Sequence, residues 1–189
     1  QKLSNNLTTG LSWRFASLPI SGQGSLHRFS VSTDGTVNFP EDINARNADS
    51  RIPSKITWGW AYEQKKKYLV SFDVNYYSGE EYDEIKLSTA GDKINFNPTW
   101  NLNLGYETYI KDWLALRLGI FTNNPSTDKI PETVTRRHQD HIDMWGFSAN
   151  VAIYTTDSAR FTLGGYYTGG QGYSTHGTGT DFKKIEKSI

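Results

Sequence analysis

The stretch KYLVSFDVNYY, residues 67 to 77, alternates between apolar and polar side chains with a period of two. This period predicts a β-strand, because successive side chains of a strand point to opposite faces. One face carries Tyr68, Val70, Phe72, Val74 and Tyr76, and the other carries Ser71, Asp73, Asn75 and Tyr77. In a soluble sandwich such an apolar face meets a core, whereas in a membrane barrel it meets lipid. The rest of the sequence has to separate these two cases.

The composition favours one β-rich domain, residues 1–189, with an apolar and a polar face. Aromatic residues make up 14% of the chain, yet its mean hydropathy is −0.61, a combination typical of alternating strands. Lys plus Arg equals Asp plus Glu at 20 each, so net charge gives no reason to expect a nucleic-acid partner. The chain has no cysteine, which excludes thiolate chemistry and disulfides. No apolar run reaches the roughly 20 residues of a membrane helix.

Short and long connections alternate along the chain. The predicted strands each come close to the roughly 9–11 residues that cross a bilayer at a tilt; they are 7–17, 25–33, 55–63, 68–77, 99–109, 113–122, 143–154 and 160–169. The short connections are LPISGQG, EQKKK, IKD and TTDSA, and the long ones are 34–54, 78–98, 123–142 and 170–181. Outer-membrane barrels have short periplasmic turns and longer extracellular loops. The alternation therefore predicts an antiparallel up-and-down transmembrane β-barrel with the four long segments outside, and it disfavours a soluble β-sandwich or a lipocalin-like barrel.

The two faces of the predicted strands differ in the way that lipid and a polar lumen require. The polar face contains glycines, which relieve crowding on the concave side of a barrel: Gly10, Gly59, Gly105, Gly119, Gly146 and Gly164. Its charges are few and of both signs, and the predicted polar network of the lumen is Arg14, Arg28, Asp73, Asn75, Asn101, Asn103, Glu107 and Arg117. The predicted lipid-facing residues and aromatic girdle are Trp13, Trp58, Trp60, Phe72, Tyr76, Trp100, Trp113 and Trp145.

Three stretches carry a resemblance to a known family. They are RIPSKITWGWAYEQKKKYLVSFDVNYY, WNLNLGYETYIKDWLALRLGIFTNNP and DMWGFSANVAIYTTDSARFTLGGYY, all within 51–169. In their residue patterns and in their order along the chain, these stretches resemble the long-chain fatty-acid transporters (FadL/TodX type) of the outer membrane. That family has a larger barrel and an N-terminal hatch segment, neither of which is found here, and the chain ends in Ile189 instead of an aromatic residue. We therefore expect the C-terminal portion of a larger barrel, with about eight or nine strands present; a self-contained barrel of about eight strands is the alternative.

The resemblance implies a bacterial outer-membrane protein that takes up hydrophobic small molecules, such as a fatty acid, without a cofactor or metal. Its expected surroundings are membrane lipid and lipopolysaccharide. A structural barrel that binds a protein partner through its extracellular loops is the alternative function. An arginine of the polar network is able to meet a substrate carboxylate, but mutual pairing of these charges is the favoured interpretation.

No pattern points to an enzyme. The four histidines lie near loops or strand ends, and no serine has a nucleophile motif around it. RRHQDHID brings His138, Asp140, His141 and Asp143 together in sequence, but the spacing is not that of a standard metal site. A solvated loop is favoured for this segment and for the acidic GEEYDE at 79–84.

Overall fold

The computed structural model describes residues 1–189 except 33, 84, 86–92, 135–137, 157–158 and 179–180. For 26–31, 38–46, 178 and 181 it describes the backbone alone. Within the described residues the chain forms twelve strands and no helix, so the predicted all-β class is confirmed. The same residues therefore include no helix long and apolar enough to span a membrane.

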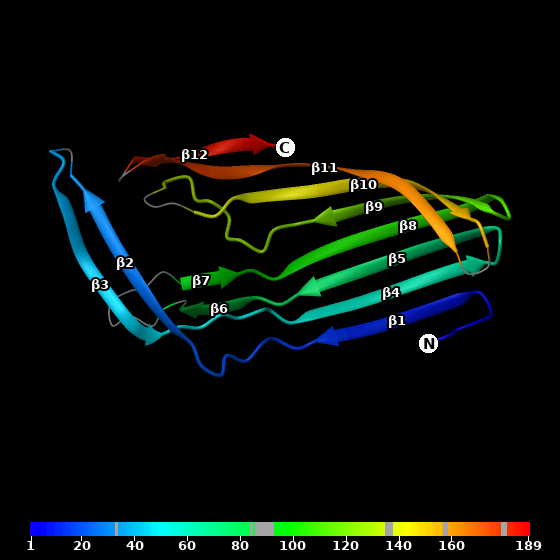
Figure 1. The fold of residues 1–189 in the computed structure, drawn as a ribbon, viewed down its shortest axis with the longest axis horizontal. Coiled ribbons are helices and arrows are strands. Elements are labelled where there is room, and N and C mark those ends of the chain that lie inside the picture. The colour runs from blue at the N-terminus through cyan, green and yellow to red at the C-terminus, as the bar shows by residue number, and fades with distance from the viewer. Residues whose placement is uncertain (33, 84, 86–92, 135–137, 157–158, 179–180) are drawn as a thin grey trace.

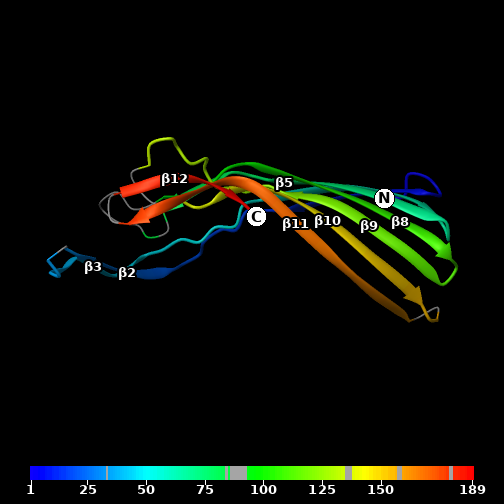
Figure 2. The same cartoon turned by 90° about the horizontal axis from the view of Figure 1, so that it is seen from above.

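Eight strands form one antiparallel sheet in the order β1-β4-β5-β8-β9-β10-β11-β12 (Figure 1). They are β1 (Leu7–Arg14), β4 (Lys55–Gln64), β5 (Tyr68–Tyr77), β8 (Thr99–Lys111), β9 (Leu114–Asn123), β10 (His141–Tyr154), β11 (Arg160–Thr178) and β12 (Asp181–Ser188). The sheet is open, because β1 and β12 are its two edges. Figure 2 shows it as a single curved layer.

The connections are sorted by length between the two ends of the sheet. The turns that join β4 to β5, β8 to β9 and β10 to β11 lie together at one end, on the right of Figure 1. The described residues of the longer segments 15–54, 78–98 and 124–140 lie at the other end. These are called the short-turn end and the long-loop end below. The predicted alternation of connections is therefore a spatial separation as well.

One predicted membrane strand lies outside the sheet. Residues 25–33 fall largely in β2 (Gln23–Val31), which pairs only with β3 (Val37–Asn47) in a separate hairpin at the long-loop end. The prediction that 34–54 is a loop is also wrong, because this segment contains β3. A tight turn joins the two strands: Gly35 has φ +83°, and the Asp34 carboxylate accepts the Thr36 N–H at 2.9 Å. Alternation gives the faces of a strand but not its partner, and here the partner closest in sequence is the one that pairs.

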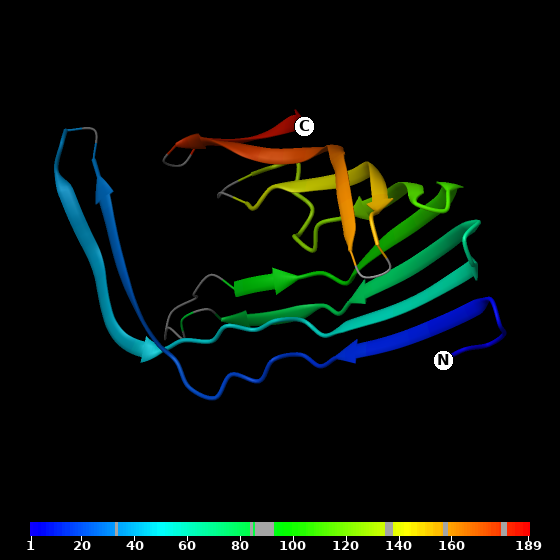
Figure 3. The ribbon, with the colours of Figure 1, turned by 45° about the vertical axis from the view of Figure 1, so that its right-hand side comes forward.

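The predicted loop 170–181 is also corrected. Residues 170–178 are the second part of β11, which pairs with β10 over its first part and with β12 over its last. Figure 3 shows that β11 bends sharply between the two parts. Glycine inside a strand marks a bend as well as a loop, which is why the run GGQG at 169–172 misleads sequence reasoning. Of the other long segments, 78–98 contains β6 (Glu80–Asp83) and β7 (Lys93–Phe96), paired with each other.

The structure has almost no conventional hydrophobic core. The buried hydrophobic residues among those described are Ala115, Ile130, Val134, Ile142 and Ala152, and no large side chain is fully buried. The tryptophans of the sheet strands and most of their leucines are exposed instead. For a chain of this length in water, such a surface is too apolar to be left uncovered.

Candidate functional site

The register of the sheet assembles the apolar side chains into continuous rows. One row crosses six strands, from β4 to β11, through directly opposed residues, and it consists of Trp60, Phe72, Leu104, Ile120, Phe147 and Tyr167. Directly opposed residues of a sheet share a face, so the row belongs to one surface, called the apolar face below. Apart from the half-buried Phe72, the members of the row are exposed, by 41% for Trp60 to 60% for Tyr167.

Aromatic side chains mark both ends of the apolar face. On β5, Tyr68 and Tyr76 bracket Val70, Phe72 and Val74, and nine residues separate the two ends inclusively. The length from Tyr68 to Tyr76 is about 26 Å at the usual rise of a strand, comparable with the roughly 25 Å apolar band of transmembrane barrels. The Tyr76 ring lies 4.5 Å from that of Trp100 at the long-loop end, and the Tyr68 ring lies 6.0 Å from that of Tyr62 at the short-turn end.

The predicted lipid-facing set mostly shares this face. Trp13, Trp58, Trp60, Phe72, Tyr76, Trp100 and Trp145 occupy it by strand register. Trp113 is instead part of the turn between β8 and β9, where the Lys111 ammonium lies 5.5 Å from the centre of its ring.

The predicted polar network shares the opposite face, called the polar face below, with one exception. Arg14, Asp73, Asn75, Asn101, Asn103, Glu107 and Arg117 lie there by strand register. Asn103 stands directly opposite Asp73, and the Thr57 hydroxyl donates to the Asn75 side-chain oxygen at 2.8 Å. Arg28 is the exception: it lies on β2, outside the sheet, so its place in this network is wrong.

On β4, β5, β8, β9 and β10 the polar face is the less exposed of the two, which reverses the order expected for a sheet in water. On β4, Trp58, Trp60 and Tyr62 are exposed, whereas Thr57, Gly59 and Ala61 between them are half-buried. Curvature produces this difference, because side chains converge on the concave side of a sheet. A side chain at the half-buried Gly119 illustrates the crowding: its Cβ would lie 2.7 Å from the Ser148 hydroxyl oxygen. Of the six predicted glycines, Gly10 differs, since a Cβ there meets nothing within 4 Å.

A closed polar cluster lies on this face towards the short-turn end. Arg117 Nε donates to Glu107 Oε2 at 2.6 Å, and Arg117 Nη2 donates to the Tyr154 hydroxyl at 3.0 Å. The Tyr154 hydroxyl donates in turn to Glu107 Oε1 at 3.3 Å, and the Tyr109 and Tyr154 hydroxyls are 3.2 Å apart. The four side chains come from three adjacent strands, so they tie β8, β9 and β10 together.

The cluster answers one question that the sequence left open. Arg117 and Glu107 pair with each other, as favoured above, and the pair is largely shielded, with side-chain exposures of 23% and 15%. Tyr109 and Tyr154 are not among the predicted residues of the polar network. Every second residue of a strand lies on the same face, which places both tyrosines on the polar face. Tyr109 lies two residues after Glu107, and Tyr154 lies two residues after Ala152, which is on that face as well.

At the long-loop end, polar contacts fix the segment between β9 and β10. Asp128 accepts hydrogen bonds from the Asn95 and Asn97 side chains at 2.8 and 2.7 Å, and His141 Nδ1 donates to the Thr127 carbonyl at 2.8 Å. Two hollows of about 740 and 540 Å³ adjoin this segment and share Lys129, His141 and Asp143. We call the pair the rim hollow.

The two charged motifs singled out in the sequence are mostly engaged. In GEEYDE, Glu80 pairs with Arg51 at 3.0 Å and Glu81 with Lys93 at 2.5 Å, which raises the pKa of the Lys93 ammonium; Glu84 lies outside the described residues. In RRHQDHID, Arg136 and Arg137 are outside them as well. Over the described part of the chain, no three His, Cys, Asp or Glu side chains have the geometry for a metal ion.

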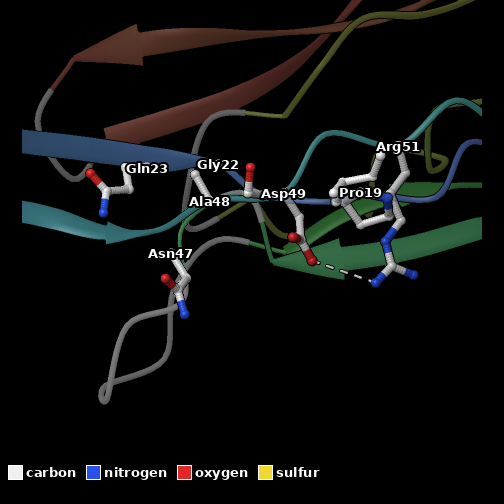
Figure 4. A pocket seen from close by; sticks show the side chains of 9 residues that line it. Pro19, Gly22, Gln23, Asn47, Ala48, Asp49 and Arg51 are labelled. Carbon is white, nitrogen blue, oxygen red and sulfur yellow. Dashed lines mark hydrogen bonds and ion pairs between the residues drawn. The ribbon is translucent and has the colours of Figure 1, made fainter.

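A third hollow, of about 810 Å³, lies at the base of the β2–β3 hairpin. Figure 4 shows Arg51 beside it, with its guanidinium reaching the Asp49 carboxylate at 3.5 Å. The same guanidinium binds Glu80, so it connects the base of this hairpin to the start of β6. Arg51 therefore links the β2–β3 hairpin to the β6–β7 hairpin.

Comparison with models of known protein families found no match, and comparison with curated protein sequences found none either.

Proposed function

We propose that this chain is part of the wall of an outer-membrane β-barrel, with the apolar face in lipid and the polar face towards the lumen. The exposed apolar face is the observation that supports this most. Burial of apolar surface contributes about 25 cal/mol per Å², so an eight-stranded sheet without a core needs an apolar medium on that face. Lipid supplies it, and the aromatic ends of the face match the two interfaces of a bilayer.

The orientation follows from the loops. Short turns face the periplasm in outer-membrane barrels, and long loops face outwards. Under this proposal the β2–β3 hairpin, the β6–β7 hairpin and the rim hollow are extracellular. An unpaired strand edge is too costly in lipid, so under this proposal the edges at β1 and β12 do not remain open in the membrane.

We further propose that the barrel takes up hydrophobic small molecules passively. The support is the resemblance of 51–169 to the fatty-acid transporters. The closed cluster of Glu107, Arg117, Tyr109 and Tyr154 favours the second candidate, a barrel that serves structure or partner binding, because this cluster braces the wall and leaves Arg117 engaged.

Expression of the full chain in a Gram-negative host that lacks its own fatty-acid transporter tests both parts. The first readout is recovery of the protein in outer membranes after a urea wash, and the second is accumulation of a fluorescent long-chain fatty acid. Membrane recovery with uptake above that of the empty vector is expected. Membrane recovery without uptake would favour the structural barrel, and recovery in the soluble fraction would refute the membrane wall.

A further inference from the structure

We propose that the rim hollow binds the phosphorylated sugar headgroup of an outer-leaflet glycolipid. The inference rests on the proposed membrane wall and adds a ligand site to it. It is carried by the position of the hollow relative to the apolar face, by its lining and by the contacts that hold it open.

The position places the hollow at headgroup depth. On β10, His141, Asp143 and Trp145 alternate onto the apolar face, so the two polar residues directly continue the aromatic end of that face. Trp100 lies at the same end and lines the larger hollow. Tryptophan marks the interface of a bilayer, and the next residues outwards meet the headgroups. Acyl chains against Trp100 and Trp145 would bring a headgroup to His141 and Asp143.

The lining suits a phosphorylated sugar better than a simple anion. Lys129 and Lys184 supply ammonium groups for phosphate. Asp143, Glu186 and Glu132 line the same space, and their carboxylates are acceptors for hydroxyl groups. A sugar phosphate uses both kinds of group, because its phosphate can bind the ammonium groups while its hydroxyl groups donate to the carboxylates.

The hollow is held by contacts that do not involve a ligand. Lys184 donates to Glu132 at 2.7 Å and lies 4.1 Å from the centre of the Tyr173 ring. His141 is bound to the Thr127 carbonyl, and the Lys187 ammonium lies 3.0 Å from the Asp140 carboxylate. These contacts join β10, β12 and the segment between β9 and β10, so the site is formed before any lipid binds.

The test measures binding of diphosphoryl lipid A to the full chain in detergent micelles by native mass spectrometry. Phosphatidylcholine and inorganic phosphate are the comparison probes. We expect a preference for lipid A, reduced about fivefold by Lys129→Gln and about 25-fold by Lys129→Gln with Lys184→Gln, from the attraction of each basic side chain to an anionic lipid. Lys129→Arg keeps the charge and should retain binding. Lys93→Gln removes a lysine that lies outside the hollow and should leave binding unchanged.

Three outcomes would overturn the site: equal binding of lipid A and phosphatidylcholine, an equal loss in Lys93→Gln, or displacement of lipid A by an equal concentration of inorganic phosphate. Lys184 also pairs with Glu132, so its substitution could disturb the fold. If the double variant is poorly folded, the loss of lipid A binding is judged from the single Lys129→Gln variant. Insertion is measured separately, by recovery in vesicles after a urea wash. If the protein inserts but does not prefer lipid A, only the proposed lipid site is refuted. If it does not insert, the proposed membrane wall is refuted as well.

Discussion

Phe72→Arg tests where the apolar face lies, because Phe72 is at the centre of the band on β5. It lies four residues from Tyr68 and four from Tyr76, about 13 Å from each along the strand. On the lipid face of a barrel, arginine costs about 2–4 kcal/mol at the midplane and about 0–1 kcal/mol near the interfaces. The substitution also removes the Phe72 ring, whose centre is 6.0 Å from that of Trp60; such a pair contributes about 0.5–1.5 kcal/mol. The expected loss of unfolding free energy is therefore about 3–5 kcal/mol.

Two matched variants separate these contributions. Phe72→Leu removes the aromatic pair alone and should cost about 0.5–1.5 kcal/mol. Tyr76→Arg introduces the same charge at the aromatic end of the band and removes a ring that contacts Trp100. It should cost only about 1–2 kcal/mol.

The assay is an equilibrium urea titration of each variant in phospholipid vesicles, followed by tryptophan fluorescence and extrapolated to zero denaturant. Tryptophan fluorescence reports on the apolar face, because five of the six tryptophans of the chain lie on it. If Phe72→Arg costs no more than Tyr76→Arg, the apolar face has no depth dependence and is not in a bilayer. If the wild-type chain folds to the same stability in buffer without lipid, the argument from the missing core fails as well.

Two further predictions concern the polar face. Gly164→Ala should lower the unfolding free energy by about 1–3 kcal/mol, because the new methyl group meets the backbone of Ala149 and Asn150. Gly165→Ala is the control, because a Cβ at Gly165 would meet no atom within 4 Å. It should lower the unfolding free energy less than half as much in the same titration. Equal losses for the two variants would contradict a crowded concave face. Arg117→Met should cost about 2 kcal/mol, since it leaves the shielded Glu107 carboxylate without its ion pair. Lys93→Met breaks an exposed pair with Glu81 and should cost less than about 1 kcal/mol. A double-mutant cycle of Arg117 and Glu107 that shows no coupling would remove the bracing role of the cluster.

Individual strands are predictable here because one face of each is strongly apolar. In 68–77 every second residue is apolar, and the observed strand has the same bounds as the predicted one. The separation of Asp73 from Phe72 onto opposite faces follows from the backbone alone, whatever the strand pairs with. The residues of the polar network that lie in the sheet, such as Asn103 and Glu107, are found on one face for the same reason.

Partners in space are harder to predict, as β2 and β11 show. Residues 25–33 alternate as a sheet strand does, yet they pair within a local hairpin closed by Gly35. The glycines at 169–172 have the composition of a loop, yet the strand continues through them and bends. In both cases the local pattern is compatible with two structures, and long-range pairing selects one of them.

The sequence by itself determined the β class, the strands of the sheet from β1 to the first part of β11, the two faces and the alternation of short and long connections. These depend on a period of two and on turn residues, which are local properties. Only the tertiary structure decided that Tyr109 and Tyr154 complete the Glu107–Arg117 pair, and that Lys129, His141 and Lys184 border one hollow. Those groups come from segments far apart in the chain, and strand register and the fold of the long connections bring them together.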